Sequence, residues 1–141
     1  MRGKALVFSA LLLALDISST SAQSLLDEKI KCQKLGQIIF DEQIQLESEY
    51  VTFRTNFDRK NQNCYVLIDK TPSNMSQKKL WRISNLYDGA TKEILANTFY
   101  ERDENWIERM TSWYVDGKYS ISQNGFDAAE KYIADKMKTE R

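Results

Sequence analysis

The chain contains two cysteines, Cys32 and Cys64, and the segments around them have different periodicities. Apolar residues around Cys32 recur at spacings of three, four and seven, which is the pattern of one face of an α-helix. Side chains alternate across a β-strand, so Cys64, Val66 and Ile68 share one strand face. If that face looks at the helix, Cys32 reaches Cys64 without distortion of the backbone. The two cysteines therefore predict a helix that is tied to a sheet.

The N-terminal segment predicts where the protein goes. Arg2 and Lys4 are followed by an apolar run over residues 5–15, and then by small and polar residues as far as Ala22. This order is typical of a secretory signal peptide, here with cleavage after Ala22. The apolar run is too short for a good membrane span, which needs about 20 apolar residues. We therefore expect residues 1–22 to be a signal peptide, with an uncleaved anchor as the alternative.

The remaining residues, 23–141, have the length of a single domain. Export to a secreted or periplasmic location changes the meaning of the cysteines, because two thiols in an oxidising compartment usually pair. A bridge closing a loop of this size stabilises by roughly 3–4 kcal/mol if it acts through chain entropy. We therefore expect a structural disulfide between Cys32 and Cys64, and a redox-active pair is the alternative.

A helix is predicted from Ser24 to about Leu46, with Ser24 as its N-cap. One apolar stripe of this helix contains Leu25, Cys32, Leu35, Ile39 and Leu46. A second stripe flanks it and contains Leu26, Ile30, Phe40 and Ile44. The resulting apolar arc is wide, which predicts that the helix lies across a sheet.

The centre of the chain reads as strands joined by short turns. Alternating side chains predict strands over about 50–57, 63–70, 79–87 and 92–101, with a turn at Asp88-Gly89-Ala90-Thr91. Trp81 and Ile83 share one face of the third of these strands and are expected in the core. Four successive strands with short connections form an antiparallel meander.

The C-terminal third is less regular. Residues 101–110 predict a short helix or an irregular excursion, and Asp116-Gly117 predicts a hairpin between residues 113–115 and 118–121. A final helix is expected from about Asp127 to Lys138, in which Asp127 and Glu130 have the spacing of a capping box. The predicted fold is α+β: an N-terminal helix packed on a four- to six-stranded antiparallel meander, plus a C-terminal helix.

Composition restricts the chemistry. The chain has no histidine, so imidazole-based acid–base catalysis and zinc sites that need imidazole are excluded within a single chain. Basic and acidic residues number 20 each, so the chain has no net positive charge that would attract nucleic acid. No phosphate-binding loop, dinucleotide glycine pattern or calcium loop is present in the sequence. We expect no catalytic residue, no metal and no cofactor.

The aromatic residues are the candidate binding residues. Trp106, Trp113, Tyr114 and Tyr119 lie in or near the predicted hairpin, where exposed rings would form a stacking platform for a sugar or a partner chain. The alternative is that these rings fill the core. Acidic clusters at residues 47–49 and 101–104 are the carboxylates that a small carbohydrate-active protein would use.

The first expectation for function is an exported, non-catalytic binding or accessory domain with a protein or glycan partner in the envelope or medium. The alternatives are a secreted carbohydrate-active or glycan-binding protein and a secreted enzyme inhibitor, whose best candidate loop is Thr71 to Gln77. Asn74-Met75-Ser76 is a glycosylation sequon in that loop. The ligand, the oligomeric state and the source organism are left open.

Two resemblances accompany this interpretation. In the segments Asn63–Ile68 and Asn85–Gly89 the chain resembles a loose group of small exported two-cysteine bacterial proteins of unknown function. The resemblance implies a periplasmic or extracellular domain and no particular activity. A long N-terminal helix on an antiparallel sheet is also similar to cystatin-like folds. The inhibitory Gln-x-Val-x-Gly motif of cystatins is missing. Gln37-Ile38-Ile39 lacks its glycine and lies inside the predicted helix.

Overall fold

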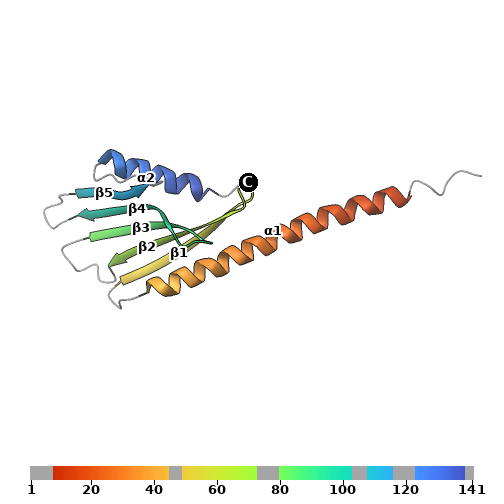
Figure 1. Cartoon of the computed structure of the whole chain (residues 1–141), viewed down its shortest axis with the longest axis horizontal. Helices are drawn as coiled ribbons and strands as arrows, with labels where there is room; N and C mark the ends of the chain where they lie inside the picture. The colour runs from red at the N-terminus through yellow and green to blue at the C-terminus, as the bar shows by residue number, and fades with distance from the viewer. Residues whose placement is uncertain (1–7, 45–48, 73–79, 103–107, 116–122, 139–141) are drawn as a thin grey trace, which may run out of the picture.

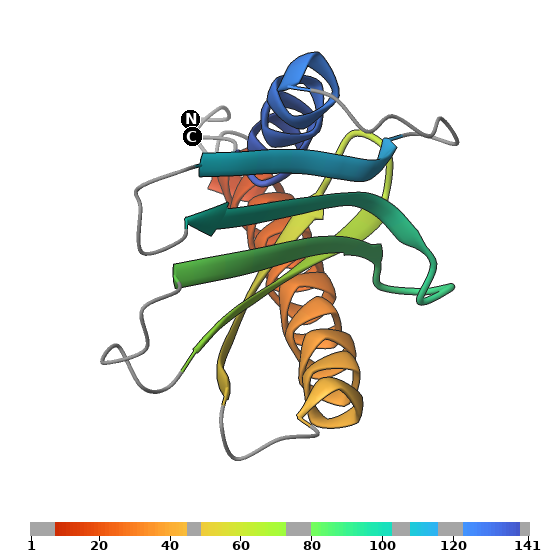
Figure 2. The ribbon, with the colours of Figure 1, turned by 90° about the vertical axis from the view of Figure 1, so that its left-hand side faces the viewer.

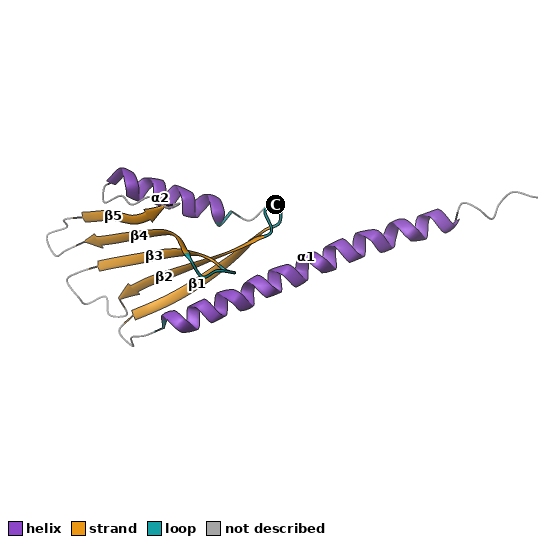
Figure 3. Ribbon diagram, in the orientation of Figure 1, coloured by secondary structure: helices purple, strands orange, loops and turns teal. Residues whose placement is uncertain are grey.

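A computed structural model describes residues 8–44, 49–72, 80–102, 108–115 and 123–138 (Figure 1). In chain order the elements are α1 (Phe8–Gln43), β1 (Glu49–Asp58), β2 (Asn63–Pro72), β3 (Leu80–Asp88), β4 (Ile94–Arg102), β5 (Glu108–Val115) and α2 (Gln123–Lys136). The strands form one five-stranded antiparallel sheet in the order β1-β2-β3-β4-β5 (Figure 3). The α+β fold with an antiparallel meander is therefore confirmed, with five strands.

The two helices cover opposite faces of this sheet (Figure 1). Cys64, Val66 and Ile68 of β2 pack against Cys32 and Ile39 of α1, and we call this side the α1 face. The intervening residues of β2 point to the other side, the α2 face. There Tyr65 and Leu67 form a second cluster with Leu86, Ala96 and Ile133. The sheet thus carries two cores, and α2 lies over the strands at the β5 end.

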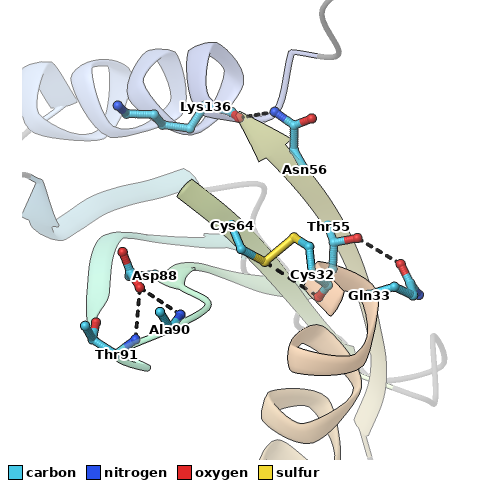
Figure 4. Close-up of a disulfide and its surroundings, with 9 residues drawn as sticks. All are labelled: Cys32, Gln33, Thr55, Asn56, Cys64, Asp88, Ala90, Thr91 and Lys136. Atoms are coloured by element: carbon cyan, nitrogen blue, oxygen red, sulfur yellow. Dashed lines mark hydrogen bonds between the residues drawn. A yellow bond between two sulfur atoms is a disulfide. The ribbon is translucent and has the colours of Figure 1, made fainter. Parts of the chain in front are cut away.

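The disulfide joins α1 directly to β2 (Figure 4), and the other α1 residues of this core cluster, Leu35, Ile39 and Phe40, follow Cys32 along the helix. Cys32 and Cys64 are bonded, with their Cα atoms 5.4 Å apart. Both side chains are buried, and the amide of Gly89 in the β3–β4 turn donates to the Cys64 carbonyl at 2.7 Å. The predicted Cys32–Cys64 disulfide is confirmed. The disulfide joins α1 to β2, and the hydrogen bond from Gly89 brings the β3–β4 turn to the same cysteine.

Only the C-terminal part of α1 packs on the sheet, and the rest projects beyond it (Figures 1 and 2). The helix runs without interruption through Ala22, so it includes residues on both sides of the predicted cleavage site. Removal of residues 1–22 stays a prediction. Among the residues that the structure describes, no helix is long and apolar enough to cross a membrane.

The second predicted stripe of α1 is mostly unburied. Leu26, Ile30 and Ile44 are about half exposed, and only Phe40 packs, with its ring centroid 4.9 Å from that of Phe53. Periodicity identified these residues as apolar neighbours, but α1 turns only its Cys32–Ile39 side to the sheet. The prediction that this helix lies across the sheet is confirmed, but the contact uses the first stripe and Phe40 and leaves the rest of the second stripe half exposed.

Three further boundaries differ from the prediction. Glu108–Met110 belongs to β5 and pairs with β4, so the helix predicted for residues 101–110 does not form there. β2 continues to Pro72, where a loop was expected. Helix α2 begins at Gln123, which places Asp127 inside the helix and excludes the capping box. The predicted sixth strand, residues 118–121, lies outside the described residues.

Helix α1 approaches β1 closely at Gly36, so we expect a glycine-to-alanine substitution there to destabilise the protein. Alanine in place of glycine usually stabilises a helix by about 1 kcal/mol. At Gly36 an added Cβ would lie 2.4 Å from Thr55 Cγ2 and 3.1 Å from Phe53 Cε2. Thr55 is held in place because its hydroxyl donates to Gln33 Oε1 at 2.8 Å. We therefore expect Gly36→Ala to destabilise by about 1–3 kcal/mol, measured by urea denaturation.

The control for this prediction is Gln37→Gly at the exposed neighbouring position. It should cost about 1 kcal/mol through helix propensity and the loss of the exposed hydrogen bond from Gln37 to Asp41. A gain of stability in Gly36→Ala would contradict the close contact between α1 and β1.

Candidate functional site

A concave surface lined by charged and apolar side chains lies between α2 and the α2 face of the sheet. It is a groove of about 580 Å³, which we call the α2 groove. Five elements supply its walls, namely β1, β2, β3, β4 and α2. Its polar wall residues include Arg54, Asp69, Arg82, Ser84, Glu130 and Lys138. Its apolar residues include Leu67, Ile133 and Met137.

Strand register builds one side of the groove. Asp69 on β2 lies opposite Ser84 on β3, and the Ser84 hydroxyl donates to Asp69 Oδ1 at 2.6 Å. Arg54 on β1 approaches the other oxygen, with Nη2 3.6 Å from Asp69 Oδ2. The Asp69 carboxylate thus has a different partner at each oxygen. The Arg54 side chain is 68% exposed, so it can reach solvent or a ligand while its partner stays in place.

An ion pair closes the other side. Arg82 Nη2 on β3 lies 2.7 Å from Glu130 Oε1 on α2, and both side chains are about half exposed. Exposed pairs of this kind contribute about 0–1 kcal/mol, so this pair opens at little cost when a ligand offers other charges. Tyr100, opposite Arg82 in the register, donates to Glu108 at 3.1 Å. Desolvation, followed by this hydrogen bond, raises the pKa of Tyr100 above its ordinary value.

The C-terminus of α2 is fixed to β1 and β2, which holds the groove open. Asn56 Nδ2 donates to the carbonyls of Lys136 and Lys138, at 2.7 and 3.0 Å, and so satisfies carbonyls that the end of a helix leaves unpaired (Figure 4). Lys136 Nζ also donates to the Tyr65 hydroxyl at 3.2 Å. This hydrogen bond raises the pKa of Lys136, which keeps its charge at neutral pH.

The structure does not test the predicted binding residues, because their side chains lie outside what it describes. Trp113 and Tyr114 lie on β5, but their side chains are outside what the structure describes, and Trp106 and Tyr119 are outside it altogether. The aromatic platform therefore stays a prediction. Trp81 and Ile83 share the α1 face, as expected, and are half-buried. The sequon residue Asn74 also lies outside the described residues.

The acidic clusters do not converge in the part of the chain that the structure describes. Glu49 on β1 and Glu101 on β4 are three strand spacings apart, which is about 14 Å. A glycosidase needs two carboxyl groups separated by roughly 5–9.5 Å. No group of three potential metal ligands occurs among the described residues either.

Comparisons with protein-family models, with curated proteins and with solved structures find no match for this chain. The function therefore has to follow from the chain's own residues. The sequence did not predict the α2 groove, because its charged residues have the pattern of an ordinary solvent-exposed surface. The available signal was strand alternation, which places Arg54 with Asn56 and Asp69 with Leu67.

Proposed function

We propose that the protein is an exported, non-catalytic binding domain that holds a segment of a partner protein in the α2 groove. The observation that carries this proposal is the composition of the groove. The groove is lined by two arginine–carboxylate pairs, Arg54–Asp69 and Arg82–Glu130, and by apolar side chains, of which Met137 is half-buried and Leu67 and Ile133 are buried. An apolar centre with a polar, solvent-accessible rim is the usual composition of a protein–protein interface.

The charges of the rim favour a polypeptide over a simple anion or cation. Each side of the groove presents one arginine beside one carboxylate, and the remaining charged wall residue, Lys138, pairs with Asp135, so each positive charge has an acidic partner. A segment that carries both acidic and basic side chains can pair with all four groups. The absence of histidine from the sequence supports a binding role over acid–base chemistry.

The test is selection of peptides from a displayed random library against the exported protein. We expect enriched peptides to carry acidic and basic side chains around an apolar residue. Arg82→Glu should weaken their binding at least tenfold, which is about 1.4 kcal/mol, because it places two negative charges at one side of the groove.

The matched control is Lys92→Glu. Lys92 also forms an ion pair with a carboxylate of another element, Glu42, but it lies in the β3–β4 turn, away from the groove. This variant should leave peptide binding unchanged. Selection without enrichment, or equal losses in both variants, would remove the groove as the binding site.

A further inference from the structure

A second surface, independent of the α2 groove, lies where β1 meets α1. β1 is ten residues long and ends the sheet, so among the described residues it has a strand neighbour on one side only. The outer edge of such a strand presents backbone N–H and C=O groups that can pair with another strand. Long edge strands are therefore templates for association.

One side of α1 faces this edge, and the helix contacts β1 between Gln33 and Phe40. The residues of this side, which we call the α1 flank, are Leu26, Ile30, Gln33, Gln37, Phe40 and Ile44. Gln33 accepts a hydrogen bond from Thr55 of β1, and Phe40 stacks on Phe53 of β1, which fixes the flank on the β1 side. The opposite side of α1 points toward the β3–β4 turn, where Glu42 pairs with Lys92.

The α1 flank is apolar and exposed. Leu26 is 51% exposed, Ile30 45% and Ile44 50%. The residues of the flank follow one another at alternating spacings of four and three, which is the repeat of a helix that packs along a second helix. Three half-exposed aliphatic side chains thus lie along the side of α1 that faces β1, whose outer edge has no strand neighbour among the described residues.

The flank is also self-complementary. Ile30 and Ile44 lie seven residues before and after Gln37. A two-fold axis through Gln37 would place each Ile30 against Ile44 of a second, antiparallel copy. The same axis brings Lys34 beside Asp41 of that copy, so opposite charges meet twice.

The same two-fold axis is compatible with antiparallel pairing of the two β1 strands. Gly36, next to Gln37, lies against Thr55, so the axis crosses the β1 edge at Thr55. Antiparallel pairing about Thr55 sets Phe53 opposite Phe57 of the second copy and Arg54 opposite Asn56, with no like charges opposed. Strands are about 4.8 Å apart, so helices lying between β1 and β2 of each copy would have axes about 10 Å apart. This is the upper end of the 8–10 Å spacing of packed helices.

We propose that a second copy of this chain docks here, with the two β1 strands paired antiparallel into a ten-stranded sheet and the two α1 flanks in contact. Such an interface is isologous and closes on itself, so it gives a dimer and not a filament. The α2 grooves lie on the other face of that sheet and stay accessible in both copies.

The experiment is sedimentation equilibrium on the disulfide-bonded protein recovered after export. We expect a dimer for the wild type at about 100 µM, and at least a tenfold higher dissociation constant for Ile30→Lys. Ile38→Lys is the matched control, because Ile38 is 47% exposed on the other side of the same helix. This control should dimerise as the wild type does.

A second variant tests the geometry. Gln37→Cys places a thiol on the two-fold axis, and a short bismaleimide should link two copies of it through this residue, whereas Ile38→Cys should not be linked. A monomeric wild type at about 100 µM overturns the proposal. So does equal weakening by the two lysine variants, or a dimer in which Gln37→Cys cannot be linked.

Discussion

Replacing both Cys32 and Cys64 with alanine is expected to lower the free energy of unfolding by about 3–4 kcal/mol. The bond joins residues 32 positions apart, and removing it restores the conformational freedom of that loop to the unfolded chain. Alanine is preferred to serine, because both positions are buried and a hydroxyl there would lack a partner. For a domain of this size the loss is a large part of the total stability.

Urea denaturation followed by circular dichroism measures this effect. The wild type in reductant is the control, and its midpoint should fall toward that of the double variant. A loss below about 1 kcal/mol would mean that α1 is held to the sheet by packing alone, with the bond adding little constraint.

The second large effect is expected from Ile39→Ala. Ile39 is 2% exposed on α1 and belongs to the same cluster as Val66 and Ile68 of β2. Truncating it leaves a cavity between helix and sheet, which costs about 2–5 kcal/mol. The adjacent residue Ile38 is 47% exposed, so Ile38→Ala should change stability by about 0.5 kcal/mol or less.

The two variants differ by one position on one helix and carry the same substitution, so helix propensity cancels in the comparison. Urea midpoints of both proteins give the difference directly. Equal losses would contradict the orientation of α1 about its own axis, and with it the placement of the α1 flank above β1.

The hairpin of β1 and β2 could be predicted because the side chains of its strands alternate. Phe53, Cys64 and Val66 lie on the α1 face, and a shift of one residue would turn Cys64 away from α1 and from Cys32. Both faces of β2 are buried, so burial alone does not fix which face meets which helix. The cysteine supplied that information, because a thiol that pairs with Cys32 has to lie on the α1 face.

Sequence periodicity does not predict burial where it cannot show which side of a helix or strand packs against another element. Ile30 and Ile44 continue the helical pattern of α1, yet they are about half exposed and do not belong to the core between α1 and the sheet. Residues 101–110 are charged, with Trp106, Ile107 and Met110 at helical spacing, but Glu108–Met110 pairs with β4 as a strand. Tertiary contacts override local preference at such positions.

The α2 groove could not be predicted for a related reason. Arg54, Asp69 and Glu130 are far apart in the sequence, and they meet only because the strands pair in register and α2 packs opposite α1. Phe126, Ala129 and Ile133 have helical spacing in the sequence and are buried on one side of α2. The sequence did not indicate which sheet face that side would cover.

The most direct test is disulfide mapping of the protein recovered from the exported fraction, digested with trypsin under non-reducing, alkylating conditions. We predict that the peptide Cys32–Lys34 is recovered covalently linked to the peptide Asn61–Lys70, and that reductant separates the two. Recovery of both peptides as alkylated free thiols would contradict the claim that a bond formed after export holds α1 on the sheet.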